Sequence, residues 1–484
     1  MKNLEKILQG IDYTVYGKLP DFVTSLANDS RKVEKGSLFF AIRGTSTDGH
    51  KFLDQAEKND AAAVVVEEKS DLDIPQILVE NSREALSTAA KNFYNDPTSQ
   101  LKLIGITGTN GKTSTVYILQ QILSTAQIPN GSVGTLGYTI EDQHFDSSLT
   151  TPDIIDLQRT YRKMVDQRVE IAVMEVSSHA LAMKRVEDIQ FQGVCFTNIS
   201  QDHLDFHKDM DDYASTKARL FGMVDSSGFA VSSIDSQYSH LFIDNCSAAV
   251  HTFSLEKDAD YTWSADTTFH NTIKGEIQTP DQNIEIECPL SGKFNLQNIL
   301  AAVAIADQLE IKKEKISEAL AEIQSVPGRL QEITAPDQPR IFIDYAHTPD
   351  AILNVLDELR NVIPKGGHLK VIYGCGGNRD KAKRPLMTQA VEKYADLPIL
   401  TTDNPRFEEP EDIIADAKEG FSRNAEYQVI INRKEAIQNT LKNSSQKDII
   451  AILGKGHETY QEIQGTKYPF SDFKIVQEWI NENN

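Results

Sequence analysis

Short apolar runs with the composition of β-strands alternate with amphipathic helical patterns along almost the whole chain. The runs span residues 61–66, 101–106, 169–176, 194–198, 341–344, 369–373 and 449–453. Strands that alternate with helices are typical of an α/β fold with mostly parallel sheets, because each helix returns the chain to the same end of the sheet. The chain has 484 residues, and at about 150 residues a domain this length predicts about three domains.

Two polar stretches interrupt the pattern and indicate domain boundaries. One is Tyr94–Gln100 and the other is Thr334–Pro339, which contains prolines; a strand-like run follows each of them. Segments of this kind are typical of connections between packed units. The predicted domains are residues 1–98, 99–333 and 334–484.

The charge balance restricts the partners of the chain. It has 49 Lys and Arg against 71 Asp and Glu, a net charge of −22. Binding to nucleic acid or to an anionic membrane needs clustered positive charge, so neither is expected. The apolar runs are far shorter than the roughly 20 residues that cross a bilayer, the first residues form no signal-peptide core, and the four cysteines lack a CxxC spacing. We expect a cytoplasmic monomer that acts on small molecules.

The segment after residues 101–106 has the features of a phosphate-binding loop. It reads T-G-T-N-G-K-T-S, and an amphipathic helix is expected from Val116 to about Ala126. Glycines allow backbone N–H groups to face phosphate oxygens, and the helix N-terminus adds its positive end. Lys112 would bridge the β- and γ-phosphates and Thr113 would reach Mg²⁺. The alternative is a glycine-rich turn without a ligand. The candidate nucleotide-binding residues of the loop are Gly108, Thr109, Asn110, Gly111, Lys112, Thr113 and Ser114.

Candidate metal ligands follow two later strand-like runs. Glu175 stands at the C-terminal end of residues 169–176, where a carboxylate beside a phosphate loop could bind Mg²⁺; the alternative is an ordinary strand-end acid. The segment D-H-L-D-F-H, which contains His203, follows residues 194–198. It is compatible with a solvated loop, and also with zinc, although no cysteine accompanies it. Lys217 lies on a helix-like stretch, where a lysine by itself is usually a surface charge.

The spacing of the loop departs from G-x-x-x-x-G-K-[ST], because Ile106 stands where the first glycine would fall. The sequence T-G-T-N-G-K-T resembles instead the variant of the Mur ligases and folylpolyglutamate synthetases, which are ATP-dependent amide-forming enzymes, and the resemblance covers nearly the whole chain. It implies a three-domain Mur ligase architecture, with a central P-loop ATPase-like parallel-sheet domain and a C-terminal Rossmann-like domain. It further implies that Lys217, in the pattern D-H-L-D…Y-x-x-x-K, is carbamylated by CO₂. Two Mg²⁺ sites would follow, one at Thr113 and Glu175 and one at His203 and carbamylated Lys217.

Other segments resemble the nucleotide contacts of this family. The pattern G-x-x-N-x-x-N-x-x-A-A implies that Asn298 reads the nucleotide, with a helix cap as the alternative. The P-G-R element implies that Arg329 neutralises phosphate, and D-Y-A-H implies that Asp344 contacts the ribose. ATP would then lie in a cleft between the second and third domains. For the UDP-muramoyl dipeptide the resemblance suggests Ser30, Thr150, Thr151, Ser177, Arg185 and Met183, where many members have glutamine.

The motif D-N-P-R at Asp403–Arg406 predicts the incoming amino acid. In this family it is associated with meso-diaminopimelate, which is lysine with a second carboxylate at its far end, and a planar guanidinium pairs with a carboxylate bidentately. Lysine-adding relatives usually lack this arginine. The alternative is a turn with an incidental arginine. The candidate amino-acid contacts are Arg379, Asp403, Asn404, Pro405, Arg406, Gly454 and Glu458.

Taken together, the resemblance implies a ligase of peptidoglycan precursor synthesis. ATP would phosphorylate the D-glutamyl γ-carboxylate of UDP-MurNAc-L-Ala-D-Glu, and the amine of diaminopimelate would displace phosphate. The alternatives are a lysine-adding or folylpolyglutamate-synthetase-like ligase, and a nucleotide-binding regulator that catalyses nothing. The catalytic candidates are Lys112, Glu175, His203 and Lys217.

Overall fold

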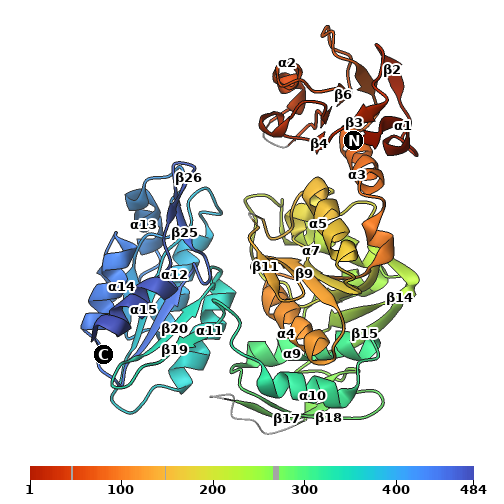
Figure 1. The fold of residues 1–484 in the computed structure, drawn as a ribbon. Coiled ribbons are helices and arrows are strands. Elements are labelled where there is room, and N and C mark those ends of the chain that lie inside the picture. The colour runs from red at the N-terminus through yellow and green to blue at the C-terminus, as the bar shows by residue number, and fades with distance from the viewer. Residues whose placement is uncertain (45–46, 148, 265–271, 484) are drawn as a thin grey trace.

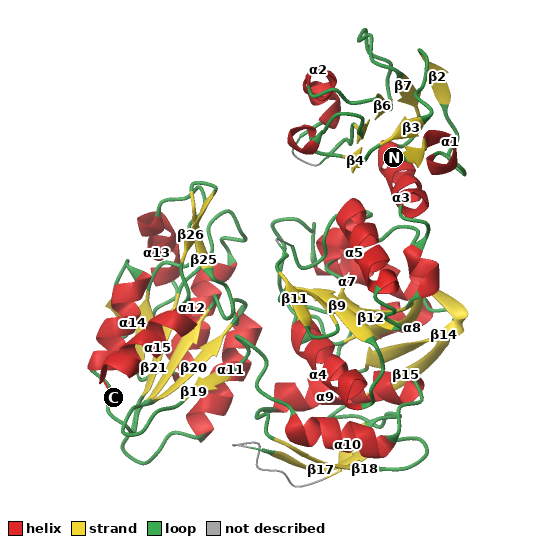
Figure 2. Cartoon of the chain, viewed as in Figure 1, coloured by secondary structure: helices red, strands yellow, loops and turns green. Residues whose placement is uncertain are grey.

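The computed structural model describes residues 1–44, 47–147, 149–264 and 272–483. In chain order they form three bodies, and Figure 1 shows the N-terminal body in red, the central body from orange to green, and the C-terminal body in blue. Each body is built on a sheet covered by helices (Figure 2). The predicted α/β class and three-part organisation are confirmed.

The N-terminal body contains a five-stranded sheet of order β2-β7-β6-β5-β4. All four residues of β6 are buried, as expected for a parallel strand that is covered on both faces. The body's strands are β1 (Lys2–Asn3), β2 (Thr14–Tyr16), β3 (Phe22–Val23), β4 (Leu26–Ala27), β5 (Leu38–Phe40), β6 (Ala63–Val66) and β7 (Gln76–Leu78), and its helices are α1 (Leu4–Ile7), α2 (Leu53–Lys58) and α3 (Ser82–Phe93).

The central body contains an eight-stranded sheet of order β11-β10-β9-β12-β8-β13-β14-β15. Its strands are β8 (Lys102–Thr107), β9 (Asn130–Gly134), β10 (Gly137–Ile140), β11 (Gln143–Phe145), β12 (Ile171–Glu175), β13 (Phe191–Phe196), β14 (Val224–Ser233) and β15 (Ala249–Phe253). Leu103 packs into one buried cluster and Ile104 into another, so alternate residues of β8 face opposite sides of the sheet.

Helices cover both faces of this sheet, and a small sheet of order β16-β17-β18 lies beside α10 (Figure 2). The helices are α4 (Lys112–Thr125), α5 (Ile154–Asp166), α6 (Ser178–Ala182), α7 (Met210–Ala218), α8 (Ser239–Asp244), α9 (Lys293–Gln308) and α10 (Lys313–Glu322), and the small strands are β16 (Thr262–Ser264), β17 (Ile273–Gln278) and β18 (Ile284–Cys288).

The C-terminal body contains a six-stranded sheet of order β19-β20-β24-β21-β22-β23, in which β19 alone is antiparallel to its neighbour. Its strands are β19 (Gln331–Ile333), β20 (Arg340–Asp344), β21 (Leu369–Tyr373), β22 (Leu397–Leu400), β23 (Gln428–Val429) and β24 (Ile449–Leu453), with a hairpin of β25 (Tyr460–Ile463) and β26 (Thr466–Pro469). Its helices are α11 (Pro349–Asn361), α12 (Lys383–Tyr394), α13 (Pro410–Lys418), α14 (Arg433–Lys442) and α15 (Asp472–Asn483).

Two local expectations differ from the structure. Residues 331–333 pair with β20, so they join the C-terminal sheet although the prediction assigned them to the central domain; the polar connector at Thr334–Pro339 is a turn within the third body. The helix after the phosphate loop begins at Lys112 rather than Val116, because its polar first turn carries no hydrophobic periodicity. No helix among the described residues is long and apolar enough to span a bilayer.

The order of the strands brings the predicted motifs to two sheet edges. In the central sheet β8 lies between β12 and β13 and runs parallel to both, so the loops that follow all three start at the same edge. In the C-terminal sheet the loops after β20, β21, β22 and β24 share an edge in the same way. Ligands of parallel α/β sheets bind at the carboxyl ends of the strands.

Candidate active site

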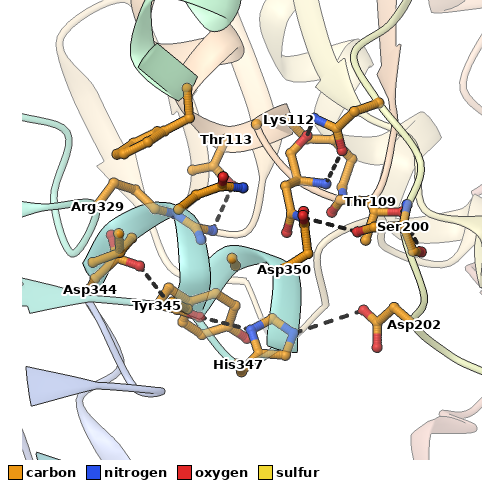
Figure 3. Close-up of a pocket in the computed structure, with 18 of the residues that line it drawn as sticks. Thr109, Lys112, Thr113, Ser200, Asp202, Arg329, Asp344, Tyr345, His347 and Asp350 are labelled. Atoms are coloured by element: carbon orange, nitrogen blue, oxygen red, sulfur yellow. Dashed lines mark hydrogen bonds and ion pairs between the residues drawn. The ribbon is translucent and has the colours of Figure 1, made fainter. Parts of the chain in front are cut away.

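A cavity of ≈ 570 Å³ is lined by loops from both of these sheet edges. Figure 3 shows its phosphate-loop side, where Arg329 and His347 of the C-terminal body approach Thr113 and Asp202 of the central body. The predicted residues that line it are Thr109, Asn110, Gly111, Lys112, Thr113, Ser114, Thr150, Glu175, Ser177, His203, Asn298, Arg329, Asp344, Arg379, Asp403, Asn404, Arg406, Gly454 and Glu458.

The phosphate loop joins β8 to the N-terminus of α4. Gly111 has φ 85°, and a β-carbon there would collide with the Oδ1 atom of Asn298. Asn298 is buried on α9 and donates to the Oδ1 atom of Asn295 at 3.4 Å. Its side chain therefore lies directly against the loop. Asn110 donates from Nδ2 to Oδ2 of Asp350 in the C-terminal body at 3.2 Å.

Two lysines converge on one carbonyl of the loop. The Nζ atoms of Lys112 and Lys217 each donate to the carbonyl oxygen of Gly108 at 2.8 Å. Lys217 is 1% exposed, so the usual surface role of a helix lysine is excluded. Burial lowers the pKa of Lys217 well below its ordinary value, and the positive charge of Lys112 lowers this pKa further. Burial also lowers the pKa of Lys112. Lys217 is therefore biased toward the neutral amine.

Glu175 closes one side of the loop from the end of β12. It is 1% exposed, and its carboxylate accepts from Oγ1 of Thr113 at 3.0 Å and from the backbone N of Thr135 at 2.7 Å. Arg329 donates from Nη2 to Oγ1 of Thr113 at 3.0 Å. A hydroxyl and a carboxylate that touch one another beside a phosphate loop fit Mg²⁺, which usually takes one or two protein oxygens together with phosphate and water.

His203 lies in the left-handed region at φ 56°. Burial lowers the pKa of His203 to about 2, so its imidazole is neutral. The centre of its ring lies 6.1 Å from the centre of the Tyr213 ring. Tyr213 and Lys217 both lie on α7, and Nζ of Lys217 is 4.7 Å from the centre of the Tyr213 ring. Tyr213 thus brings the two predicted ligands of the second metal together. No group of three or more His, Cys, Asp or Glu in the described ranges could hold a metal, so the zinc alternative gains no support.

Asp344 and Arg329 line the side of the cavity where the nucleotide is predicted to bind. Both carboxylate oxygens of Asp344 accept backbone N–H groups, from Leu330 at 2.5 Å and from Ala346 at 2.6 Å. Burial raises the pKa of Asp344. The guanidinium of Arg329 lies 4.5 Å from the centre of the Tyr345 ring. Asp344 therefore holds the loop that carries Arg329 and also lines the cavity.

The predicted dipeptide contacts cluster behind Glu175. Oγ1 of Thr151 donates to the backbone carbonyl of Glu175 at 2.8 Å, and the backbone N of Ser177 donates to that hydroxyl at 3.1 Å. Arg185 donates to the carbonyl of Thr151 at 3.2 Å and to the sulfur of Met183 at 3.3 Å. Thr151, Met183 and Arg185 do not line the cavity itself.

Thr150 and Ser30 complete the predicted set. Thr150 accepts from Oγ1 of Thr135 at 3.1 Å and lines the cavity. Ser30 lies on a short 3₁₀ turn of the N-terminal body, and its carbonyl accepts from Nδ2 of Asn59 at 2.9 Å. It is not among the residues that line the cavity.

Asp403–Arg406 follows β22 and faces the cavity from the C-terminal body. Arg406 donates from Nη1 to the carbonyl of Gly377 at 2.8 Å and pairs through Nε with Glu462 at 3.3 Å. Its backbone is clamped to β25, because its N donates to the carbonyl of Glu462 at 3.0 Å. Asn404 donates to Oε2 of Glu458 at 2.9 Å. Three of the predicted amino-acid contacts therefore form one hydrogen-bonded wall.

The other predicted amino-acid contacts surround this wall. Arg379 is exposed and lines the cavity. Gly454 has φ 107°, and a β-carbon there would lie 2.6 Å from Oδ2 of Asp403. Pro405 is buried beside Gly377 and does not line the cavity.

Sequence reasoning missed several residues of the site. Lys455 is fully buried and donates to Oε2 of Glu458 at 2.7 Å and to Oδ1 of Asn404 at 3.1 Å. Asp202 and Lys383 meet across the two bodies, with Nζ of Lys383 3.3 Å from Oδ1 of Asp202. Asp202 begins the D-H-L-D segment that the sequence analysis singled out, and Lys455 directly follows the predicted contact Gly454. Lys383 stands in a charged stretch whose pattern indicates only a solvated loop.

Comparisons with known proteins identify the family of this chain. Family models match residues 23–94 (Mur ligase family, catalytic domain), 106–306 (Mur ligase middle domain) and 328–456 (Mur ligase, glutamate ligase domain). A relative from Caldanaerobacter subterraneus subsp. tengcongensis, a UDP-N-acetylmuramoyl-L-alanyl-D-glutamate--2,6-diaminopimelate ligase, is 41% identical over 490 residues, which cover 99% of each chain. The chain belongs to the Mur ligase family.

Other members of the family are similarly close to this Mur ligase. A protein of the same description from Aquifex aeolicus is 41% identical over 459 residues, or 94% of this chain and 93% of the relative. A solved structure of a 2,6-diaminopimelate ligase of this description superposes with a TM-score of 0.66 at 32% identity and covers 95% of both chains. The three-domain Mur ligase fold that the sequence predicted is therefore confirmed.

Proposed function

We propose that this Mur ligase joins meso-2,6-diaminopimelate to UDP-N-acetylmuramoyl-L-alanyl-D-glutamate at the expense of ATP, in peptidoglycan precursor synthesis. The observation that carries the proposal is the single cavity that the phosphate loop and Arg406 both line. The names of the relatives from Caldanaerobacter and Aquifex support the same reaction.

The reaction has two steps. The γ-carboxylate of the D-glutamyl residue attacks the γ-phosphorus of ATP, and ADP leaves with the electrons of the broken phosphorus–oxygen bond. The α-amine of diaminopimelate then attacks the acyl phosphate, and phosphate leaves as the amide forms and the amine loses a proton. Lys112 would swing from the carbonyl of Gly108 onto the β- and γ-phosphates, and Arg329 would face the same charge from the other body. Stabilising charge that develops on the transferred group is the main source of catalysis in such reactions.

The residues present fit two Mg²⁺ sites. Thr113 and Glu175 would hold one ion, and His203 and a carbamylated Lys217 the other; bound Mg²⁺ would neutralise phosphate charge. The low pKa of Lys217 supports the carbamate, because only the neutral amine of a lysine can add to CO₂. The neutral imidazole of His203 has a free electron pair for a metal.

The substrates would divide among the three bodies. Ser30 would contact the uridine nucleotide, and Thr150, Thr151, Ser177, Met183 and Arg185 the muramoyl dipeptide. Gly108 to Ser114, Asn298, Arg329 and Asp344 would bind ATP, and Arg379, Asp403 to Arg406, Gly454 and Glu458 the amino acid. Figure 1 shows these three bodies in the same order along the chain.

Arg406 would select diaminopimelate over lysine. Its Nε and Nη1 atoms are engaged by Glu462 and Gly377, which orients the planar group, while its side chain lines the cavity. A guanidinium held in this way can pair with the distal carboxylate that only diaminopimelate has. Glu458, on the same wall, would accept from the distal ammonium group.

Turnover assays test the proposal. Purified protein is incubated with ATP, Mg²⁺, UDP-MurNAc-L-Ala-D-Glu and either meso-diaminopimelate or L-lysine, with ADP release and product mass as the readouts. We expect a tripeptide product with diaminopimelate and at least tenfold slower turnover with lysine. Faster turnover with lysine would identify a lysine-adding enzyme. Turnover with a folate and glutamate would identify a folylpolyglutamate synthetase, and nucleotide binding without any product would identify a regulator. We further propose a cytoplasmic monomer, which light scattering during gel filtration can test.

A further inference from the structure

A buried ion pair connects the C-terminal body to the loop that carries His203. Lys383 is the first residue of α12, and its Nζ atom lies 3.3 Å from Oδ1 of Asp202 in the central body. Lys383 is 7% exposed and Asp202 is 4% exposed. A carboxylate removed from water to this extent needs a partner of opposite charge. Since the two residues come from different bodies, that partner is present only while the bodies are docked.

Asp202 in turn holds His203 at two points. Its Oδ1 atom accepts from the backbone N of His203 at 2.9 Å, and its Oδ2 atom lies 3.3 Å from the ring Nε2 atom. His203 has a positive φ, which is unfavourable for a residue other than glycine. The contacts with Asp202 therefore hold both an unfavourable backbone and the direction of the ring. A carboxylate that fixes one ring nitrogen leaves the other to face a ligand.

Lys383 directly follows a loop that carries one of the predicted amino-acid contacts. The loop begins after β21 and carries Arg379, four residues before Lys383. His347, from the same body, approaches Oδ2 of Asp202 with Nε2 at 4.0 Å, as Figure 3 shows. Arg379, a predicted amino-acid contact, and Lys383, which pairs with Asp202, therefore lie on one short segment of the C-terminal body.

We propose that Lys383 is a positioning residue for the phosphoryl-transfer half of the site: its ion pair with Asp202 holds His203 in place when the C-terminal body is docked. The consequence rests on the proposed function: phosphoryl transfer would require the amino-acid-binding body to be in place. An acyl phosphate would then form only where the amine can reach it, and water would be kept from hydrolysing it.

Two measurements test this role on the full-length protein. The first is hydrogen exchange of the backbone in residues 199–207, followed by mass spectrometry without substrates. The variants are Lys383→Met, Asp202→Asn and the control Lys381→Met, whose side chain is 65% exposed and pairs with Glu408 at 3.2 Å. We expect faster exchange of this loop in the first two variants and wild-type exchange in the control. Unchanged exchange in Lys383→Met would overturn the proposal.

The second measurement is a double-mutant cycle in kcat. Lys383→Met and Asp202→Asn should each lower kcat by about 10- to 100-fold, and the double variant should be no more than about threefold slower than Asp202→Asn alone. KM for the amino acid should change less than about threefold, and Lys383→Arg, which keeps the charge, should recover part of kcat. Effects that multiply would show that Lys383 acts independently of Asp202, and a raised KM with unchanged kcat would show that Lys383 acts on a substrate directly; either result would overturn the proposal.

The two readouts separate this inference from the proposed function. If wild-type protein failed to turn over the proposed substrates, the proposed function would be wrong, while loop exchange would still report on Lys383. If Lys383→Met did not fold, Lys383→Gln keeps a donor of similar length and should show the same faster loop exchange; wild-type exchange in a folded Lys383→Gln would contradict the role of the charge.

Discussion

Arg406 is the residue on which the choice of amino acid depends, and its replacement gives the sharpest prediction. Arg406→Ala removes the guanidinium that lines the cavity and leaves Glu462 without its partner. The side chain of Arg406 is 21% exposed and that of Glu462 is 24% exposed. Both side chains are therefore largely buried. In Arg406→Ala the negative charge of Glu462 would no longer be balanced by the guanidinium.

The magnitude follows from this burial. Loss of one partner of a well-packed charge pair costs about 2–5 kcal/mol, and 1.4 kcal/mol is a factor of ten, so kcat/KM for diaminopimelate should fall by about 30- to 4,000-fold. The distal end of lysine carries an ammonium group and no carboxylate, and an unpaired Glu462 would attract it. We expect kcat/KM for lysine to stay level or to rise.

The assay measures ADP release at saturating ATP and UDP-dipeptide while each amino acid is varied. Arg423→Ala is the matched control, because Arg423 is an exposed arginine of the same body. The ratio of kcat/KM for diaminopimelate to that for lysine should collapse in Arg406→Ala and stay unchanged in Arg423→Ala. If Arg406→Ala lowered both values equally, the arginine would have no part in recognition of the distal carboxylate.

Three further predictions concern the loop, the lysine and acid stability. Gly111→Ala, which forces a β-carbon into Asn298 at φ 85°, should raise KM for ATP at least tenfold with an unchanged circular dichroism spectrum; wild-type KM would contradict the packing of the loop. Lys217→Ala should lose about 100-fold or more in kcat and not respond to bicarbonate, and full activity would refute the carbamate. Hydrogen bonds from Arg384 lower the pKa of Glu408 from 4.5 to about 2, so Glu408 stabilises the fold above pH 4.5 and this contribution fades as the pH falls toward 2. Glu408→Gln should thus be less stable than wild type in urea at pH 7 and converge with it near pH 2; a difference that does not vary with pH would rule the ion pair out.

The strand and loop pattern of the sequence predicted where part of the candidate site lies. The glycine spacing predicted the phosphate loop, and Glu175 was predicted to lie beside it because this acid ends a strand-like run; the structure places its carboxylate 3.0 Å from Oγ1 of Thr113. The burial of Lys217 could not be predicted from its own helix, where the polar residues Ser215, Thr216 and Arg219 surround it in the sequence; only the resemblance indicated a role for it. The structure shows why Lys217 is buried: its Nζ atom donates to the carbonyl oxygen of Gly108 in the phosphate loop.

Contacts between the bodies could not be predicted from the sequence. Lys383 and Asp202 are separated by 181 residues, and no periodicity connects positions on two different sheets. For the same reason the double use of Asp344, which lines the cavity and also accepts two backbone N–H groups, was not foreseen. The boundary near residue 333 failed for a local reason: β19 is a three-residue edge strand, too short to show an alternating pattern.

An isotope-transfer experiment tests the central claim that one cavity first phosphorylates a carboxylate and then forms the amide. UDP-MurNAc-L-Ala-D-Glu labelled with ¹⁸O in the γ-carboxylate is incubated with ATP and meso-diaminopimelate, and the released phosphate and the peptide product are analysed by mass spectrometry. The account requires one ¹⁸O atom in the phosphate for each tripeptide formed. The account would be contradicted if the labelled substrate released unlabelled phosphate, or if labelled phosphate appeared without formation of the amide product.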